Sequence, residues 1–203
     1  MVIVFARAPI AGAVKTRLIP RLGAERAARL HMRLIAAAVR TARGARCGAV
    51  ELHATSRHRY FETLQVKVDL QRGRDLGGRM YHALHTALRR HSTALLIGSD
   101  CPALEPDDLR RAARSLQGGV DVVLLPAEDG GYALIGARRI APAVFAGVRW
   151  GSADVLARTV SNLTRARLEF RLLRTVWDVD RPEDLARLRS RRFSSGVRPR
   201  ARR

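Results

Sequence analysis

The chain has 203 residues, of which 47% are hydrophobic and 5% aromatic, and its formal net charge is +20. This hydrophobic content is ordinary for a globular protein and excludes wholesale disorder, and the length is enough for one domain with a substantial core. No apolar run approaches 18 residues, so we expect no membrane span.

The positive charge is distributed unevenly. Nearly all of it comes from arginine, and eight arginines with no acid occur between positions 187 and 203. We therefore predict a domain at 1–188 followed by a basic, disordered tail at 189–203. Such a charge favours polyanions or phosphates as partners, although an Arg-rich and Ala-rich composition also follows from a GC-rich genome. Few aromatic side chains are present to stack on bases, which argues against nucleic acid as a partner.

The two cysteines, Cys47 and Cys101, form neither a zinc-binding spacing nor a disulfide framework. A reduced, cytoplasmic setting is therefore the default expectation. The opening residues are too few for the core of a signal peptide. The sequence does not decide the oligomeric state, and a homodimer is among the states we expect.

Short apolar runs alternate with segments of helical spacing along the chain. We expect strands at 2–6, 50–54, 93–98 and 120–125, with a last central strand at 169–173. We expect helices within 23–43, 76–88, 105–116 and 154–163. This alternation predicts an α/β protein with a mainly parallel sheet and helices on its faces.

A basic loop follows the first strand. It reads RAPIAGAVKTR and carries Arg7, Gly12, Lys15 and Arg17. A strand followed by a glycine-containing basic loop is a common setting for a nucleotide phosphate. The loop is not a Walker motif, because no glycine stands directly before Lys15. Lys15 and Arg17 could neutralise phosphate charge, and the alternative is a solvated basic loop.

The central buried strand ends in Gly98-Ser99-Asp100-Cys101-Pro102. Open α/β sheets bind ligands at the carboxyl ends of their strands. Asp100 is therefore a candidate for a metal-holding acid. The alternative is that Asp100 only closes a turn or caps the helix that follows.

Two glycine-rich stretches can each be interpreted either as part of a ligand site or as a purely structural element. In QRGRDLGGRM, Gly77 and Gly78 would let backbone approach a ligand, whereas Asp75 is equally well explained as a helix N-cap. In PAEDGGYALIG, the loop could enclose a substrate, but Asp129-Gly130 also favours a hairpin turn.

The last motif is WDVDRPEDL, at positions 177–185. Asp180 and Glu183 have the spacing of a capping box, and Pro182 falls early in the expected helix. This structural reading accounts for both acids and leaves Asp178 unexplained.

Five stretches now stand in order: FARAPIAGAVKTRL, QRGRDLGGRM, LIGSDCPAL, PAEDGGYALIG and WDVDRPEDL. Together, over residues 2–188, they resemble a family of small bacterial glycosyltransferase-A-like proteins. These proteins are often labelled nucleotide-diphospho-sugar transferases or arsenosugar-biosynthesis glycosyltransferases. More distantly, the chain is similar to 2-phospholactate and molybdenum cofactor guanylyltransferases. It departs from the family pattern at Ala11, Gly78 and Arg181, where Pro, Glu and Thr are common.

The resemblance implies a single-domain, Rossmann-like nucleotide-diphospho-sugar transferase (GT-A) fold that binds a nucleotide and Mg²⁺ or Mn²⁺. It implies that the metal is held by Asp100 and Asp180. The nucleotide and its phosphates would lie against Ala6, Arg7, Gly12, Lys15, Arg17, Asp75 and Gly77. The acceptor loop would comprise Asp129, Gly130, Gly131 and Tyr132, with Lys15 stabilising charge and Asp129 as the general base.

The resemblance implies two functional hypotheses, and the charge suggests a third. The first is a metal-dependent glycosyltransferase that uses a nucleotide-diphospho-sugar and a small-molecule acceptor. The second is a nucleotidyltransferase, similar to guanylyltransferases, that acts on a small phosphorylated substrate. The third, motivated by the charge alone, is a basic nucleic-acid-binding protein without catalysis.

Overall fold

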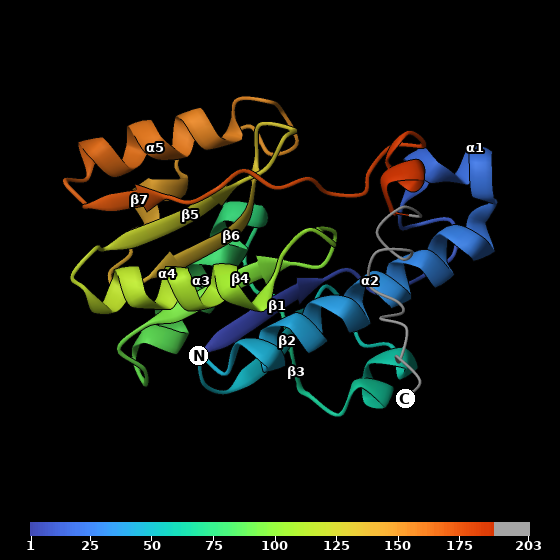
Figure 1. Cartoon of the computed structure of the whole chain (residues 1–203), viewed down its shortest axis with the longest axis horizontal. Helices are drawn as coiled ribbons and strands as arrows, with labels where there is room; N and C mark the ends of the chain where they lie inside the picture. Colours follow the sequence, from blue (N-terminus) through green and yellow to red (C-terminus); the bar gives the residue numbers. More distant parts are fainter. Residues whose placement is uncertain (189–203) are drawn as a thin grey trace, which may run out of the picture.

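The computed structural model describes residues 1–188, in which a seven-stranded sheet has helices on both faces (Figure 1). The predictions for the tail at 189–203 lie outside the described residues. The strands are β1 (Val2–Ala6), β2 (Val50–Ala54), β3 (Lys67–Leu70), β4 (Ala94–Gly98), β5 (Val122–Pro126), β6 (Tyr132–Ala137) and β7 (Phe170–Leu172). The α-helices are α1 (Ile19–Leu22), α2 (Ala24–Ala45), α3 (Leu76–Leu88), α4 (Pro106–Gln117) and α5 (Val155–Arg165), with 3₁₀ segments at Thr16–Leu18, Arg59–Leu64 and Pro142–Phe145.

The sheet has the strand order β3-β2-β1-β4-β6-β5-β7. All neighbouring strands are parallel except at β6, which pairs antiparallel with both β4 and β5. The carboxyl ends of β1, β2, β4, β5 and β7 therefore share one edge of the sheet, and β6 begins there. The predicted mainly parallel α/β architecture is confirmed.

The core lies on both faces of the sheet, because alternate residues of a strand point to opposite faces. Val2 and Val4 of β1 belong to the apolar cluster under α2 and α4, whereas Ile3 and Phe5 belong to the cluster that includes α3 and α5. Helices α2 and α4 pack side by side on the first of these faces (Figure 1). No helix within residues 1–188 is long and apolar enough to cross a membrane.

Two local predictions were wrong, and one strand was not predicted. Strand β7 lies at the edge of the sheet and not in its centre, which fits its alternation of apolar residues with Glu169 and Arg171. Strand β3 was not predicted, because its residues Lys67–Leu70 are all exposed and give no buried apolar run. The expected capping box of Asp180 and Glu183 is replaced by Asp184, whose carboxylate accepts hydrogen bonds from the backbone N–H groups of Asp180 and Arg181, at 3.0 and 2.7 Å.

After β7 the chain continues alongside the end of β5, where Val176 and Ala127 form a parallel bridge, and runs past the carboxyl edge of the sheet toward α1 (Figure 1). We call residues 174–180 the crossing segment. It is held to the strand ends by backbone hydrogen bonds from Val176 to Pro126 and from Val179 to Asp100, both 2.9 Å. Val179 is buried with Leu18 and Leu34 in a small third cluster. The fold thus places the WDVD motif above the ends of β4 and β5.

Candidate active site

Lys15 joins three loops at the carboxyl edge of the sheet. Its ammonium lies 3.0 Å from Asp100 Oδ2 and donates a hydrogen bond to the Val179 carbonyl at 2.5 Å. Its side chain is only 3% exposed, and its backbone has a positive φ of 49°. Such a conformation costs free energy and persists where the surroundings hold it in place. The loop after β1, the end of β4 and the crossing segment are therefore tied together at one buried ammonium group.

Asp100 lies between two nitrogen-bearing side chains. Its Oδ2 faces Lys15, and its Oδ1 lies 3.4 Å from Nδ1 of His31, whose Nε2 donates to the Arg7 carbonyl at 3.2 Å. Burial alone would raise the pKa of Asp100, but the His31 imidazole and the Lys15 ammonium together lower it well below its usual range. Asp100 is thus a carboxylate that stays ionised, and its side chain remains 45% exposed at the edge of the site.

A cavity of about 300 Å³ opens beside Asp100, and we call it the acidic cavity. Three carboxylates line it, from Asp100 after β4, Asp129 after β5 and Asp178 in the crossing segment. The other lining residues are Leu76, Met80, Gly98, Cys101, Ala127, Gly131, Tyr132, Ala133, Trp150, Gly151, Ser152 and Val155. Within the described chain, no lysine or arginine lines this cavity.

Asp178 is the carboxyl group in the acidic cavity whose pKa this environment raises. Partial burial, together with the neighbouring carboxylates of Asp129 and Asp180, raises its pKa to about 6, although Lys15 acts in the opposite direction. A carboxyl group with a raised pKa that faces a cavity is a frequent mark of a functional site. The residue that the sequence left unexplained therefore lies in the centre of the candidate site.

We expect Asp178→Asn to stabilise the metal-free protein at neutral and alkaline pH. Because the folded-state pKa is above the ordinary value, ionising Asp178 opposes folding, and stability is lost as pH rises from about 4 through 6. Asp178 is partly exposed, so solvent screening reduces the gain to about 1 kcal/mol at pH 8. Urea unfolding with a chelator should show this gain at pH 8 and none at pH 4. A gain independent of pH would contradict the assignment.

Close backbone packing shapes the walls of the acidic cavity. Gly77 at the start of α3 is buried, and a Cβ there would lie 2.7 Å from the Trp150 ring. Gly130 has a φ of +87°, and a Cβ there would lie 2.1 Å from the Ala153 carbonyl oxygen. Its own carbonyl accepts a hydrogen bond from Leu156 N at 2.9 Å. The predicted hairpin turn after β5 is confirmed, and it is seated against the loop before α5.

Two buried polar atoms on these walls have no hydrogen-bond partner within residues 1–188, namely Nε1 of Trp150 and the hydroxyl of Tyr132. The Tyr132 hydroxyl lies near Thr159 but outside hydrogen-bond geometry. Buried polar groups in proteins are almost always paired. Both atoms belong to residues that line the acidic cavity, but each is shielded from solvent by the surrounding protein.

The structure places the remaining predicted residues around this centre in different ways. Arg17 is 62% exposed and forms an ion pair with Asp180, and neither residue lines the acidic cavity. Asp75 caps α3, since it accepts a hydrogen bond from Gly78 N at 2.7 Å. Gly12 has a φ of +84° with open space around it, and Arg7 is exposed. Ala6 ends β1 in the buried sheet, and its carbonyl accepts from Thr55 N at 3.1 Å.

His31 is a site residue that the sequence reading missed. It lies on the buried stripe of α2, one turn after Ala27 and one turn before Leu34 and Ile35. A polar side chain at a core position of an amphipathic helix is the signal that could have revealed it. Trp150 gave no signal beyond the start of a helical segment, and its place beside α3 depends on packing that is distant in sequence.

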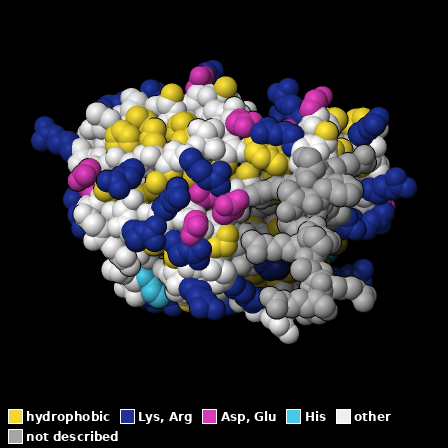
Figure 2. All heavy atoms as spheres, in the orientation of Figure 1, with side chains coloured by type: hydrophobic (Ala, Val, Ile, Leu, Met, Phe, Trp, Pro, Cys, Tyr) yellow, Lys and Arg dark blue, Asp and Glu magenta, His cyan; other side chains and the backbone are white. Residues whose placement is uncertain are grey.

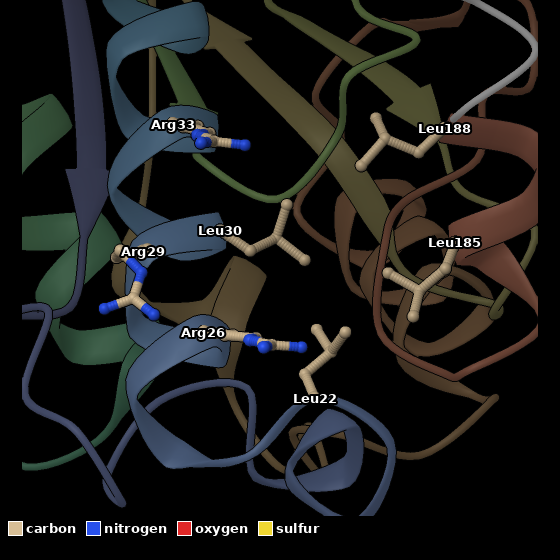
Figure 3. Close-up of a pocket in the computed structure, with 7 residues that line it drawn as sticks. All are labelled: Leu22, Arg26, Arg29, Leu30, Arg33, Leu185 and Leu188. Atoms are coloured by element: carbon tan, nitrogen blue, oxygen red, sulfur yellow. The ribbon is translucent and has the colours of Figure 1, made fainter.

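Other concave surfaces lack this chemistry. A cavity of about 380 Å³ between α1, α2 and the last described residues is lined by four leucines and three arginines, drawn in Figure 3: Leu22, Leu30, Leu185, Leu188, Arg26, Arg29 and Arg33. It contains none of the predicted site residues and no titratable pair. On the face drawn in Figure 2, lysine and arginine side chains are scattered among acidic and apolar groups instead of forming a continuous stripe. The acidic cavity is therefore the better candidate for an active site.

Comparison with known proteins gives one family and several related structures. The model of the family described as "Uncharacterized protein conserved in bacteria (DUF2064)" matches residues 34–152. No curated protein matches the chain. A solved structure from Desulfovibrio desulfuricans G20, described as a "putative nucleotide-diphospho-sugar transferase", is 35% identical in sequence and has a TM-score of 0.86, and the match covers 96% of this chain and 88% of that chain.

Two more distant structures share the fold. A nucleotidyl transferase from Methanothermobacter is 17% identical, with a TM-score of 0.67 and coverage of 97% of this chain and 99% of that chain. A Mycobacterium tuberculosis H37Rv protein, solved in complex with manganese, is 18% identical, with a TM-score of 0.55 and coverage of 92% and 96%. Together with the strand order, these matches confirm the expected Rossmann-like nucleotide-diphospho-sugar transferase fold.

Proposed function

This chain belongs to the bacterial family whose model it matches, and on that premise we propose that it is a metal-dependent glycosyltransferase that uses a nucleotide-diphospho-sugar donor. The observation that carries the proposal is the convergence at one sheet edge of a cation-bearing loop, an ionised Asp100 and the acidic cavity. The relative that is 35% identical over nearly the whole chain is described as a "putative nucleotide-diphospho-sugar transferase". Ligands of open α/β sheets bind at this edge.

The donor diphosphate would bind on the exposed side of the loop after β1. Arg17 offers a planar guanidinium that matches phosphate geometry, and it is exposed while paired with Asp180. We propose for Lys15 a role other than phosphate binding, because its buried ammonium is engaged by Asp100 and Val179. We therefore assign Lys15 to fixing Asp100 in place, and Arg17 to contacting the phosphates.

Replacing Arg17 with alanine should weaken nucleotide-diphosphate binding at least about tenfold, because a charge-assisted contact is lost. Stability should change little, since the Arg17–Asp180 pair is exposed. Isothermal titration with a nucleoside diphosphate measures the affinity. Arg110→Ala is the matched control, because Arg110 also pairs with an aspartate, Asp107, but does so on α4. Equal weakening in both variants would assign the effect to net charge and not to a contact.

The carboxylates fit a divalent cation. Within residues 1–188 no three His, Cys, Asp or Glu side chains are gathered closely enough to hold a metal ion. Mg²⁺, however, is usually bound by one or two carboxylates together with substrate phosphates. Asp100 and Asp178 line the same cavity, and partial burial, together with the neighbouring carboxylates of Asp129 and Asp180, raises the pKa of Asp178. We propose these two as the metal-holding pair, in place of Asp180, which does not line the cavity.

In the proposed reaction, the bound metal and Asp129 would have separate roles. A bound Mg²⁺ or Mn²⁺ would stabilise the charge on the departing diphosphate. Asp129, at the turn after β5, is exposed and lines the cavity, so it can accept a proton from an acceptor hydroxyl. Its carboxylate is oriented by Gly131 N, which donates to Oδ1 at 2.9 Å.

Thermal unfolding with a panel of nucleotides and nucleotide-diphospho-sugars, with and without Mn²⁺, tests the proposal. A ligand present at about one hundred times its Kd stabilises the folded state by about 2.7 kcal/mol. We expect such stabilisation from a nucleotide-diphospho-sugar, dependent on Mn²⁺, reduced by Asp178→Asn and unchanged by the remote Asp107→Asn. A preference for a nucleoside triphosphate would favour nucleotidyl transfer instead. No stabilisation by any member at millimolar concentration would overturn the proposal.

A further inference from the structure

The side of α2 that faces away from the sheet carries a groove. The cavity of about 380 Å³ drawn in Figure 3 adjoins a second cavity of about 540 Å³. Both cavities are lined by the same four residues: Arg29, Leu30, Arg33 and Leu188. We call the two cavities together the α2 groove. Leu22 lines the first cavity and Arg40 lines the second, so the groove follows α2 over most of its length.

Leucines form the floor of the α2 groove. Leu30 of α2 and Leu185 of the helical segment at 184–188 point toward each other across it (Figure 3). The four leucines of the floor are half-buried and pack against the cluster that contains Leu18, Leu34 and Val179. They are Leu22, Leu30, Leu185 and Leu188. The floor is therefore apolar, partly open to solvent, and bounded by two helical segments.

Unpaired arginines form the rim of the groove. Arg26, Arg29, Arg33 and Arg40 are exposed, and within residues 1–188 their guanidinium groups form no ion pair or hydrogen bond. Arg29 comes three residues after Arg26 and four before Arg33, and like charges at these spacings destabilise a helix. Glu25 is the only acid of α2, and it pairs with none of these arginines in the described chain. The rim therefore holds uncompensated positive charge along an apolar floor.

The chain itself offers no occupant of opposite charge. Each helix from α1 to α5 carries more arginines than acids, and residues 189–203 contain arginines and no acid. A second copy of the chain, or its own last residues, would bring further positive charge to the rim. Nucleic acid would pair with the arginines, but its phosphates gain nothing from leucines. An amphipathic helix with carboxylates beside its apolar face matches both the floor and the rim.

We propose that the α2 groove binds an acidic amphipathic helix of a partner protein. The apolar face of that helix packs on Leu30 and Leu185, and its carboxylates pair with Arg26, Arg29 and Arg33. The α2 groove shares no lining residue with the acidic cavity. This docking surface is therefore separate from the candidate active site, and the inference does not depend on the proposed transferase function.

Two labelled peptides test the proposal with the full-length protein. One is a helix of about 18 residues with leucines on one face and glutamates elsewhere, since shorter helices are marginal in water. The other has the same composition in an order that does not gather the leucines on one face. Fluorescence anisotropy measures the Kd of each peptide. We expect the amphipathic peptide to bind at least about tenfold more tightly, because only its leucines can pack together on the floor.

Variants then assign the binding to named groups. Arg29→Glu and Leu30→Ser should each weaken binding of the amphipathic peptide about tenfold. Arg165→Glu makes the same charge change on α5, which packs with the apolar cluster on the opposite face of the sheet, and should leave the Kd nearly unchanged. Arg29→Glu should not lower the thermal midpoint, because it replaces repulsion from Arg26 and Arg33 with attraction. Its loss of binding would therefore not result from unfolding.

Several results would overturn the proposal. Equal binding of the two peptides would show that net charge alone attracts them. A dimer that Leu30→Ser dissociates in sedimentation would identify a second copy as the occupant. Tighter peptide binding after Phe193→Ser would identify the chain's own residues 189–203. If the peptide does not bind, but polyuridylate or phosphatidylglycerol vesicles bind through Arg29 and Leu30, the partner is RNA or a membrane instead.

Discussion

Replacing Asp100 with asparagine is expected to cost about 3 kcal/mol of unfolding free energy at pH 7. The reason is the ammonium of Lys15, whose side chain is 3% exposed and which would lose its carboxylate partner and be left with neutral acceptors such as the Val179 carbonyl. Removing one partner of a buried ion pair leaves an uncompensated charge and is strongly destabilising. Urea unfolding of the two proteins measures the difference directly.

The reverse substitution should be milder, and this asymmetry makes the prediction specific. Lys15→Met removes the buried charge and fills the same space, while Asp100, at 45% exposure, remains solvated and close to His31. We expect a cost of about 1 kcal/mol, since apolar replacement of a buried ion is often tolerated. A Lys15→Met variant less stable than Asp100→Asn would show that the pair is organised around the carboxylate instead.

Acid titration gives an independent check on the same pair. The pKa of Asp100 is lowered in the folded state, so its stabilisation is present above the ordinary carboxyl range and is lost as pH falls. The gap between wild type and Asp100→Asn should therefore close in acid. Asp178 has the opposite sign, and its effect should appear only as pH rises.

Gly130→Ala is expected to destabilise the protein by about 3 kcal/mol and to disrupt the acidic cavity. Two costs add at this position: the left-handed φ of +87°, and a Cβ placed 2.1 Å from the carbonyl oxygen of Ala153. Since that oxygen is backbone, the hairpin turn must move away from the loop before α5. Asp129 would move with it, so binding of acceptor analogues should weaken as well.

Gly12→Ala is the matched control for this prediction. Gly12 has a similar φ of +84°, but nothing lies within 4 Å of the position that a Cβ would take there. It should therefore show only the conformational cost, about 1 kcal/mol. Thermal and urea unfolding of both variants separate the two terms. Equal losses in Gly12→Ala and Gly130→Ala would mean that the contact with Ala153 adds nothing.

Most of the fold could be predicted because its signals are local. The apolar runs of β1, β4 and β5 and the periodicity of α2 are short-range patterns, and each is confirmed. Strand β3 was not predicted, because an exposed edge strand needs no apolar run. Strand β7 was predicted to be central and lies at the edge, because the sequence does not reveal the order of strands in a sheet. The capping contact at Asp184 was missed because several acids stand within one turn of one another.

The sequence by itself determined which segments of the chain carry the candidate site residues. A buried strand that ends in Asp100, a basic loop after the first strand and an acidic hairpin turn all follow from residue type and spacing. Tertiary structure alone decided how these groups are paired. Strand β7 lies at the edge of the sheet, and the crossing segment that follows it runs past the carboxyl ends of the strands. This path places Asp178 at the acidic cavity and the Val179 carbonyl against the Lys15 ammonium. Charge pairing depends on distance in space, so the ammonium expected to bind phosphate is instead bound to Asp100.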